Sequence, residues 1–180
     1  AIYDEAFHRC TGIKEIVIPA SVEYLGGFSQ CTNLEKVIFK GDSKLKTIGK
    51  MAFYQCFKLS TITLPDGVTS VEQQAFEDCD ALIGLNIPDG ITTISKQVFY
   101  KCDNLQDIVL HSGITSIGDG AFQECRSLET LVVPANVTYI GSTAFMSCES
   151  LENVNIPSGV TTIYNSTFQN CKSLTNVNIS

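Results

Sequence analysis

Residues 121–141, AFQECRSLETLVVPANVTYIG, decide the fold, because the same order of residue types returns in residues 144–164, AFMSCESLENVNIPSGVTTIY. In both stretches a Phe lies three residues before a Cys, and a Leu lies three residues after it. Two further aliphatic residues and a Pro follow, and the second stretch begins 23 residues after the first. Self-similarity at a fixed period indicates a repeat protein, in which each unit is one structural turn.

The repeat extends along the whole chain. From one Cys to the next the intervals are 21, 25 and then five times 23 residues, and every Cys has a Phe three residues before it. The cysteines are Cys10, Cys31, Cys56, Cys79, Cys102, Cys125, Cys148 and Cys171. We therefore predict a single array over residues 1–180. The array has about eight repeats of 23 residues and is cut within a repeat at both ends.

The order of residues within one unit indicates how it folds. After the Leu or Ile that lies three residues past each Cys, apolar and polar residues alternate, which predicts a short strand with one face turned inward. The Pro that usually follows ends this strand, because Pro has no backbone N–H for a ladder. A turn, a second short extended piece and the A-F-x-x-C element complete the unit, the last predicting a helical or 3₁₀ turn that brings Phe inward. No unit has a closed core, so the units must stack as a parallel solenoid.

The pattern L-x-x-I-x-I-P-x-x-V-x-x-I-G-x-x-A-F-x-x-C resembles the 23-residue leucine-rich repeats of the BspA-like (Treponema-type) class over essentially the whole chain. The resemblance implies an α/β-type repeat solenoid, a right-handed coil with a parallel β-sheet on the concave face and short turns or 3₁₀ pieces on the convex side. It also implies a secreted or cell-surface protein of a host-associated organism that takes part in adhesion. The family brings no catalytic residues, and none are carried over.

Composition excludes several classes of function. The net charge is −7, with 12 Lys and Arg against 19 Asp and Glu, which argues against a nucleic-acid partner. No run of 18 apolar residues occurs, so we expect no membrane span in this segment. The chain has two histidines, no glycine-rich phosphate loop and no H-E-x-x-H motif. We therefore predict that the protein is not an enzyme and has no catalytic residue, cofactor or metal site.

The eight cysteines allow three interpretations. An even count suggests disulfides, but equivalent side chains of stacked coils are parallel, whereas a disulfide needs a dihedral angle near 90°. A zinc site needs four converging ligands, which a straight file at 23-residue intervals does not supply. The remaining interpretation is that Cys serves as a small buried hydrophobic residue beside Phe, and we favour it.

The candidate binding surface consists of the outward residues of the first strands, which lie five and seven positions after each Cys, together with Lys40 and His111, which replace the Pro at the strand end. Half of the residues seven positions after each Cys are apolar, although they should face water, and such apolar patches can mark contact sites. The alternative is that these residues are β-branched because such residues suit strands. Residues 36–58 hold six of the 12 basic residues and one acidic residue, so a basic stretch lies in an acidic chain. The predicted partner-binding residues are Lys36, Ile38, Lys40, Thr63, Asn86, Asp107, Val109, His111, Val132 and Asn155.

These features favour a non-enzymatic protein-binding or adhesion module of a cell-surface or secreted protein, with a host protein or glycan bound on the concave sheet. Two alternatives remain: a passive spacer that binds nothing, and a cytosolic interaction scaffold, which is compatible with reduced thiols. The localisation rests on the family resemblance, since this segment shows no signal peptide. For the oligomeric state, both a monomer and end-to-end self-association are compatible with the sequence.

Overall fold

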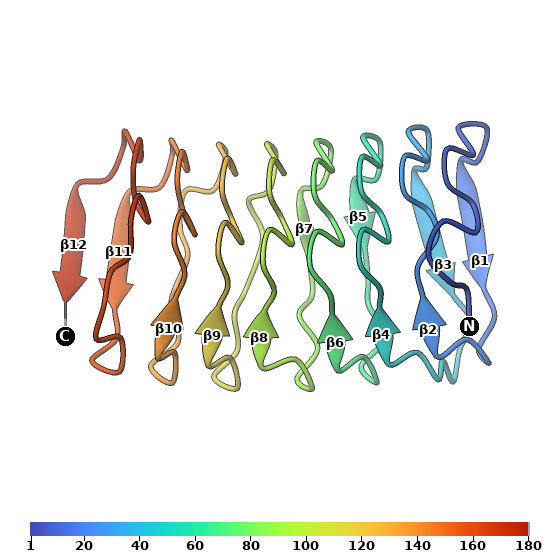
Figure 1. Cartoon of the computed structure of the whole chain (residues 1–180), viewed down its shortest axis with the longest axis horizontal. Coiled ribbons are helices and arrows are strands. Elements are labelled where there is room, and N and C mark those ends of the chain that lie inside the picture. Colours follow the sequence, from blue (N-terminus) through green and yellow to red (C-terminus); the bar gives the residue numbers. More distant parts are fainter. Residues whose placement is uncertain (180) are drawn as a thin grey trace.

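The computed structural model describes residues 1–179 and shows a parallel-strand β-solenoid of about seven turns (Figure 1). Each coil can contain two short strands, which lie on different faces of the stack. We call the face formed by the first strands, expected to be concave, the strand face. Its strands are β1 (Glu15–Ile18), β3 (Lys36–Phe39), β5 (Thr61–Ile62), β7 (Gly84–Leu85), β11 (Asn153–Ile156) and β12 (Asn176–Ile179).

The second strands of the coils form the lateral face. They are β2 (Tyr24–Leu25), β4 (Thr47–Ile48), β6 (Ser70–Val71), β8 (Thr93–Ile94), β9 (Ser116–Ile117) and β10 (Tyr139–Ile140). The strand pairs in residues 1–179 are parallel and join equivalent positions of neighbouring repeats, for example Glu15 with Lys36 and Thr93 with Ser116. The predicted stacking of repeats as coils with parallel strands is therefore confirmed.

The two irregular intervals fall in turns and leave the strand registers intact. The two residues missing from the first interval are lost between β2 and Phe28, where Gly26 and Gly27 run close to the first coil. A Cβ atom at Gly27, whose φ is +89°, would lie 2.6 Å from the carbonyl oxygen of Tyr3. The two additional residues of the next interval lie in the exposed loop between β3 and β4. Indels are tolerated at such sites because neither one shifts a strand.

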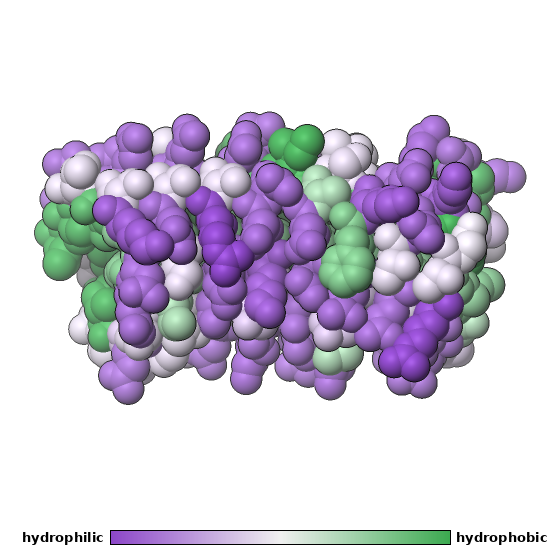
Figure 2. Space-filling model, turned by 90° about the horizontal axis from the view of Figure 1, so that it is seen from above, coloured by the Kyte–Doolittle hydropathy of each residue, from purple (hydrophilic) through white to green (hydrophobic). Residues whose placement is uncertain are grey.

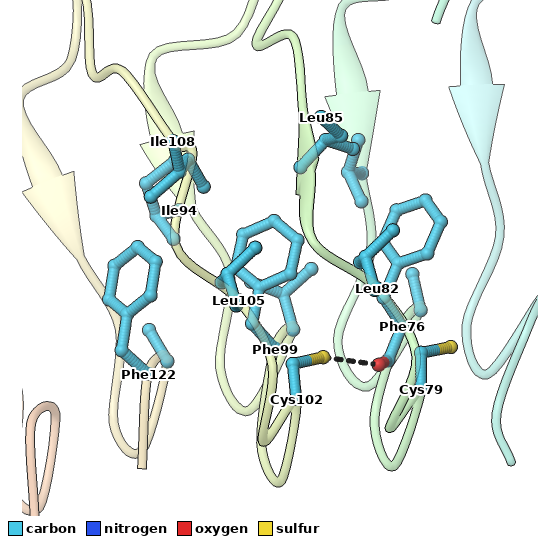
Figure 3. Close-up of a cluster of buried hydrophobic side chains, with 14 of the residues drawn as sticks. Phe76, Cys79, Leu82, Leu85, Ile94, Phe99, Cys102, Leu105, Ile108 and Phe122 are labelled. Atoms are coloured by element: carbon cyan, nitrogen blue, oxygen red, sulfur yellow. Dashed lines mark hydrogen bonds between the residues drawn. The ribbon is translucent and has the colours of Figure 1, made fainter. Parts of the chain in front are cut away.

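A file of stacked phenylalanines forms the centre of the core. Consecutive rings from Phe7 to Phe168 have centroids 5.1–5.9 Å apart and lie nearly parallel. The six inner members, from Phe28 to Phe145, are fully buried together with the neighbouring Cys and Leu columns. Figure 3 shows Phe76, Phe99 and Phe122 in this arrangement. Because each ring is covered by rings of two other coils, a single coil could not be stable alone.

Each buried thiol makes a specific hydrogen bond within this core. The Sγ of Cys102 donates to the carbonyl oxygen of Phe76, one coil back, at 3.1 Å (Figure 3). That oxygen also accepts the backbone N–H of Cys79 at 3.3 Å, so both of its lone pairs are used. The same thiol bond recurs at every Cys from Cys31 to Cys171, at 3.0–3.3 Å. Cys fits this position because its side chain is small and apolar but can donate.

The predicted burial of the cysteines is confirmed for six of them and is wrong for Cys10, which is exposed, while Cys171 is partly buried. Both belong to outer coils of the stack and have a neighbouring coil on one side only. Burial raises the pKa of the inner thiols, most strongly at Cys79, Cys102 and Cys125. The inner cysteines are therefore held as thiols, the form that donates the bond to Phe.

The A-F-x-x-C segments are turns and not the helical or 3₁₀ pieces that the sequence suggested; residues 1–179 contain no helix. The expected α/β character is therefore also wrong, because both faces of the coils carry strands or turns. The physical reason is a pair of residues with positive φ, one immediately before A-F-x and one immediately after it, such as Gln74 and Asp78, both with φ of 61°. A helix cannot continue through a left-handed residue.

These left-handed residues direct backbone N–H groups toward the next coil. The amides of Gln74, Phe76 and Asp78 donate to carbonyl groups of Lys96, Val98 and Tyr100 at 2.7–3.1 Å. We call this series of bonds between successive A-F-x-x-C segments the turn ladder. It has two bonds at each of the first two junctions between coils and three at each of the following five.

Candidate functional site

The strand face lacks the continuity of the turn ladder. Its backbone pairing joins β1 to β3, β5 to β7 and β11 to β12, and isolated bridges extend it from Gly84 to Asp107 and from Thr130 to Asn153. Within residues 1–179, no pairing joins β3 to β5 or the segment around Asp107 to that around Thr130. The face therefore has two interruptions, and the first of the hollows described next lies at the interruption between β3 and β5.

The first hollow, which we call the lysine hollow, has a volume of about 670 Å³. It is lined by residues 36–43 and 61–67, so it lies between β3 and β5 and beside the loop that carries the two additional residues. Both charges are present in its lining, as Lys36 and Lys40 with Asp42 and Asp66. The Nζ of Lys36 lies 3.5 Å from Glu15, an exposed pair that water screens.

The second hollow, the central hollow, has a volume of about 600 Å³ and contains Asp107, Val109 and His111. Val109 is 79% exposed. His111 replaces the usual Pro, and its Nε2 lies 3.2 Å from the carbonyl oxygen of Pro88 while its Nδ1 accepts the N–H of Gly113 at 3.1 Å. Both ring nitrogens are therefore engaged with the backbone, which fixes the imidazole at the rim. No hydrogen bond joins His111 to Asp107 among the described contacts.

Asn86 also lines the central hollow, and its amide continues the pairing where strands β5 and β7 end. Its Oδ1 accepts the N–H of Leu64 at 2.8 Å, and its Nδ2 donates to the carbonyl of the same residue at 3.0 Å. The side chain thus satisfies both backbone groups of Leu64 in the way that a strand would. Asn86 therefore has a structural role that the sequence did not indicate, and its bonds to Leu64 use one N–H and one lone pair of its amide.

The third hollow, the amide hollow, has a volume of about 420 Å³ and lies over the last three coils of the strand face. Val132 is 80% exposed at its side. Its polar lining consists of Thr130 and four asparagines, Asn153, Asn155, Asn176 and Asn178. It is the only one of the three hollows without an ionisable lining residue.

The ten predicted binding residues divide among these three hollows. Lys36, Ile38, Lys40 and Thr63 line the lysine hollow; Asn86, Asp107, Val109 and His111 line the central hollow; Val132 and Asn155 line the amide hollow. Three residues of the amide hollow, Asn153, Asn176 and Asn178, were not selected. The repeated sequence N-V-N-I at 153–156 and 176–179 was the signal that could have identified them.

The lysines of residues 36–58 do not form one patch. Lys36 and Lys40 lie on the strand face, whereas Lys46 flanks lateral strand β4 and its Nζ donates to the carbonyl of Gly67 at 3.3 Å. Lys58 follows Cys56 in the turn at the opposite edge of the coil. Because one coil is a closed loop, residues that are neighbours in sequence point in different directions around it. A partner on the strand face would meet only two of these lysines.

The turns that follow the cysteines carry a charged network. Arg126 lies 2.8 Å from Asp103, 2.6 Å from Glu124 and 4.0 Å from Glu149, and Lys172 lies 2.8 Å from Glu149. The Lys172 ammonium lowers the pKa of the Glu149 carboxyl group. Figure 2 looks onto this edge of the solenoid, whose surface is mainly hydrophilic, with hydrophobic residues at both ends and at a few separate places between them. This edge is a solvated border of the molecule.

Metal binding and membrane spanning were also considered for the described part of the chain. No group of three or more His, Cys, Asp or Glu side chains there could hold a metal ion. No helix that is long and apolar enough to cross a membrane is found in residues 1–179.

Similar proteins of known structure share this architecture. A leucine-rich repeat protein of T. pallidum is 30% identical, with a TM-score of 0.75, over 92% of this chain and 69% of its own. A leucine-rich cell surface protein of Faecalibacterium prausnitzii is 28% identical, with a TM-score of 0.66, over 98% of this chain and 62% of its own. The pneumococcal vaccine antigen PcpA, at 18% identity and a TM-score of 0.62, covers 92% of this chain and 56% of its own and shares the fold.

This chain thus spans less than two thirds of the length of two of these three proteins. No curated protein matches it. The profile of the BspA type leucine-rich repeat region, in six copies, matches residues 1–125 and 92–180, which together include every residue. The chain belongs to the BspA-type leucine-rich repeat family.

Proposed function

We propose that this chain is a non-enzymatic binding module of a secreted or cell-surface protein and that it holds a host polypeptide on its strand face. The observation that carries the proposal is the position of the three hollows, of about 670, 600 and 420 Å³, which follow one another along this single face. Solenoid proteins typically contact their partners through an extended surface to which each coil contributes a few outward residues.

The exposed apolar side chains of the strand face support the proposal. Val109 and Val132, at equivalent positions of neighbouring coils, are 79% and 80% exposed. Adjacent exposed valines cost solubility unless a partner covers them, and contiguous apolar groups on a monomer surface often have a binding role. Val17, at the same position in β1, is exposed to a smaller extent.

A polypeptide suits the lysine and central hollows better than an acidic polymer does. The lining of the lysine hollow has two lysines and two aspartates, and the central hollow adds Asp107 beside Val109. A folded protein surface can offer both signs of charge and an apolar side chain, whereas a polyanion would meet the three aspartates unfavourably. The mixed charge of the lining therefore favours a partner that itself offers both signs of charge.

The proposed location rests on the relatives. One similar structure is described as a leucine-rich cell surface protein, and another, which shares the fold, as a vaccine antigen. A surface protein of a host-associated organism meets host matrix proteins as its first possible partners. The passive spacer remains the second candidate function, since regular stacking alone would be sufficient for it.

Surface plasmon resonance against purified fibronectin, fibrinogen, laminin and collagen tests the proposal. We expect one of them to bind the intact protein and Val109→Asp to weaken that binding by about tenfold or more, because the variant places a charge at the centre of the contact. The matched control is Thr92→Asp, which adds the same charge at an exposed position beside β8 on the lateral face.

Equal binding by the two variants would show that the strand face is not the contact surface. If none of the four proteins binds, the passive spacer is favoured over the proposed function.

A further inference from the structure

Two asparagine ladders form the floor of the amide hollow. The Nδ2 of Asn176 donates to the Oδ1 of Asn153 at 2.7 Å, and the Nδ2 of Asn178 donates to the Oδ1 of Asn155 at 2.6 Å. The four amides therefore form a grid of two rows and two columns on β11 and β12. Because both ladder bonds run in the same direction, the amides are held in one orientation.

The ladders leave defined donors and acceptors unused. The Nδ2 groups of Asn153 and Asn155 have no partner in residues 1–179, and the Oδ1 of Asn178 accepts no bond there. The next residue in the file of Asn155 is Val132, whose side chain offers no acceptor and is 80% exposed. Oriented amide donors thus lie beside an open apolar surface.

The composition of the grid calls for an explanation beyond strand formation. Asn has a low preference for strands, yet it occupies every outward position of β11 and β12. Equivalent outward positions of β1 and β3 carry Glu15, Val17, Lys36 and Ile38. The sheet pairs in register in both places, so the stacking of coils does not require Asn.

We propose that the amide hollow is a binding site for an uncharged sugar, one or two rings of a neutral oligosaccharide. A sugar hydroxyl both donates and accepts, so it can join an amide N–H of one row to an amide oxygen of another. The C–H face of the ring would lie on Val132. The hollow is of the size of small-ligand sites, at about 420 Å³, and it has no ionisable lining residue.

Charge distinguishes this site from the rest of the strand face. The lysine and central hollows contain Lys, Asp and His side chains, which suit a protein surface. An anionic glycan would find no cation in the amide hollow, and a purely apolar ligand would leave the amides without partners. The sugar site is separate from the proposed protein contact at Val109, and either can exist without the other.

The test uses the intact protein with three uncharged probes, cellohexaose, maltohexaose and N-acetylchitohexaose, measured by calorimetry and by saturation-transfer NMR at millimolar concentration. Heparin and a blocked Gly-Ser hexapeptide are the anionic and peptide probes. We expect at least one neutral oligosaccharide to bind and the two other probes not to bind at this site.

The decisive variant is Asn155→Asp, which replaces the amide donor by an oxygen and changes no other atom of the side chain. The bond from Asn178 can persist, because an Asp oxygen occupies the acceptor position. We expect oligosaccharide binding to weaken by about tenfold. The matched control is Thr92→Asp, which places the same charge beside β8 on the lateral face and should bind sugar like the parent protein.

A circular dichroism melt of both variants shows whether they are folded. Failure of all three oligosaccharides to bind, equal sugar binding by Asn155→Asp and the parent, or binding of only heparin or the peptide would each overturn the proposal. Binding of a matrix protein through Val109 would be unaffected by any of these results, so failure of the sugar site and failure of the protein contact remain distinguishable.

Discussion

The two sides of this solenoid are built from the same repeats but are held together differently. The turn ladder crosses all seven junctions between coils, with two or three backbone bonds at each. The strand face pairs fully at its two ends, through β1–β3 and β11–β12, and is interrupted after β3 and again between Asp107 and Thr130. The turn side of each coil therefore fixes the distance between neighbouring coils, whereas the backbone pairing on the strand face differs from one junction to the next.

The difference teaches where this array tolerates sequence change. On the turn side the Phe ring, the Cys thiol and two left-handed residues must recur in every coil, since each contacts the next coil. On the strand face only the inward residues are required for packing. The outward residues change from Glu and Lys to Val and to Asn along the same file, and the hollows that we assign to binding lie among them.

The largest expected effect comes from removing one ring of the phenylalanine stack. Phe122 is fully buried between Phe99 and Phe145, at centroid distances of 5.5 Å. Phe122→Ala should lower the free energy of unfolding by about 3–5 kcal/mol, because it removes the ring and leaves a cavity. Denaturant titration followed by circular dichroism measures this.

The strand-face counterpart, Val132→Ala, is the control, and it should cost about 0.5 kcal/mol or less because Val132 is exposed. A cost below about 1 kcal/mol for Phe122→Ala would contradict the assignment of the stack as the core.

A smaller effect tests the thiol bonds. Cys102→Ala removes the Sγ that donates to Phe76 and should cost about 2 kcal/mol. Cys102→Ser keeps a donor at the same position and should be more stable than Cys102→Ala by about 1 kcal/mol. The same pair of variants at Cys10, which is exposed and whose thiol donates no hydrogen bond within residues 1–179, should show no difference. If Ser and Ala are equivalent at position 102, the thiol serves only to fill space.

The left-handed positions of the turn ladder give the smallest expected effect. Gly120 and Thr143 occupy equivalent positions, with φ of 59° and 55°. Gly120→Thr should destabilise by about 1–2 kcal/mol, because a β-branched residue is strained there. Thr143→Gly relieves that strain but makes the unfolded chain more flexible, so a change within about 0.5 kcal/mol is expected. Thermal melts of the two variants compare them, and a tolerated Gly120→Thr would show that the left-handed turn is not a constraint.

The sequence predicted the features of the fold that follow from residue type and from the 23-residue period. The Phe, Cys and Leu columns identified the core and the parallel stacking, since burial of apolar groups repeats with the coil. It did not predict the turn geometry, because the left-handed positions are occupied by residues as different as Gln74, Lys101 and Thr143, and only two of these positions, Gly27 and Gly120, carry a glycine.

For the candidate site, the sequence predicted which residues share one face. Files of outward residues follow from the strand period, so residues such as Val109 and Val132 were placed correctly on one face. The sequence did not predict where strand pairing is interrupted. Pairing depends on the distance between backbones of neighbouring coils, and no single residue type indicates that distance. The amide of Asn86 illustrates the difficulty, because nothing in the sequence indicates that it bonds to both backbone groups of Leu64.

Native-state hydrogen exchange tests the central claim most directly. The claim is that the turn ladder is continuous and that the strand face is interrupted. We predict that the amides of Phe53, Phe76, Phe99 and Phe122, which donate to the next coil at 2.8–3.0 Å, exchange slowly. The amides of Thr63 and Val132, at the two interruptions, should exchange much faster. Equal protection at both sets of amides, or faster exchange in the turns, would contradict the account.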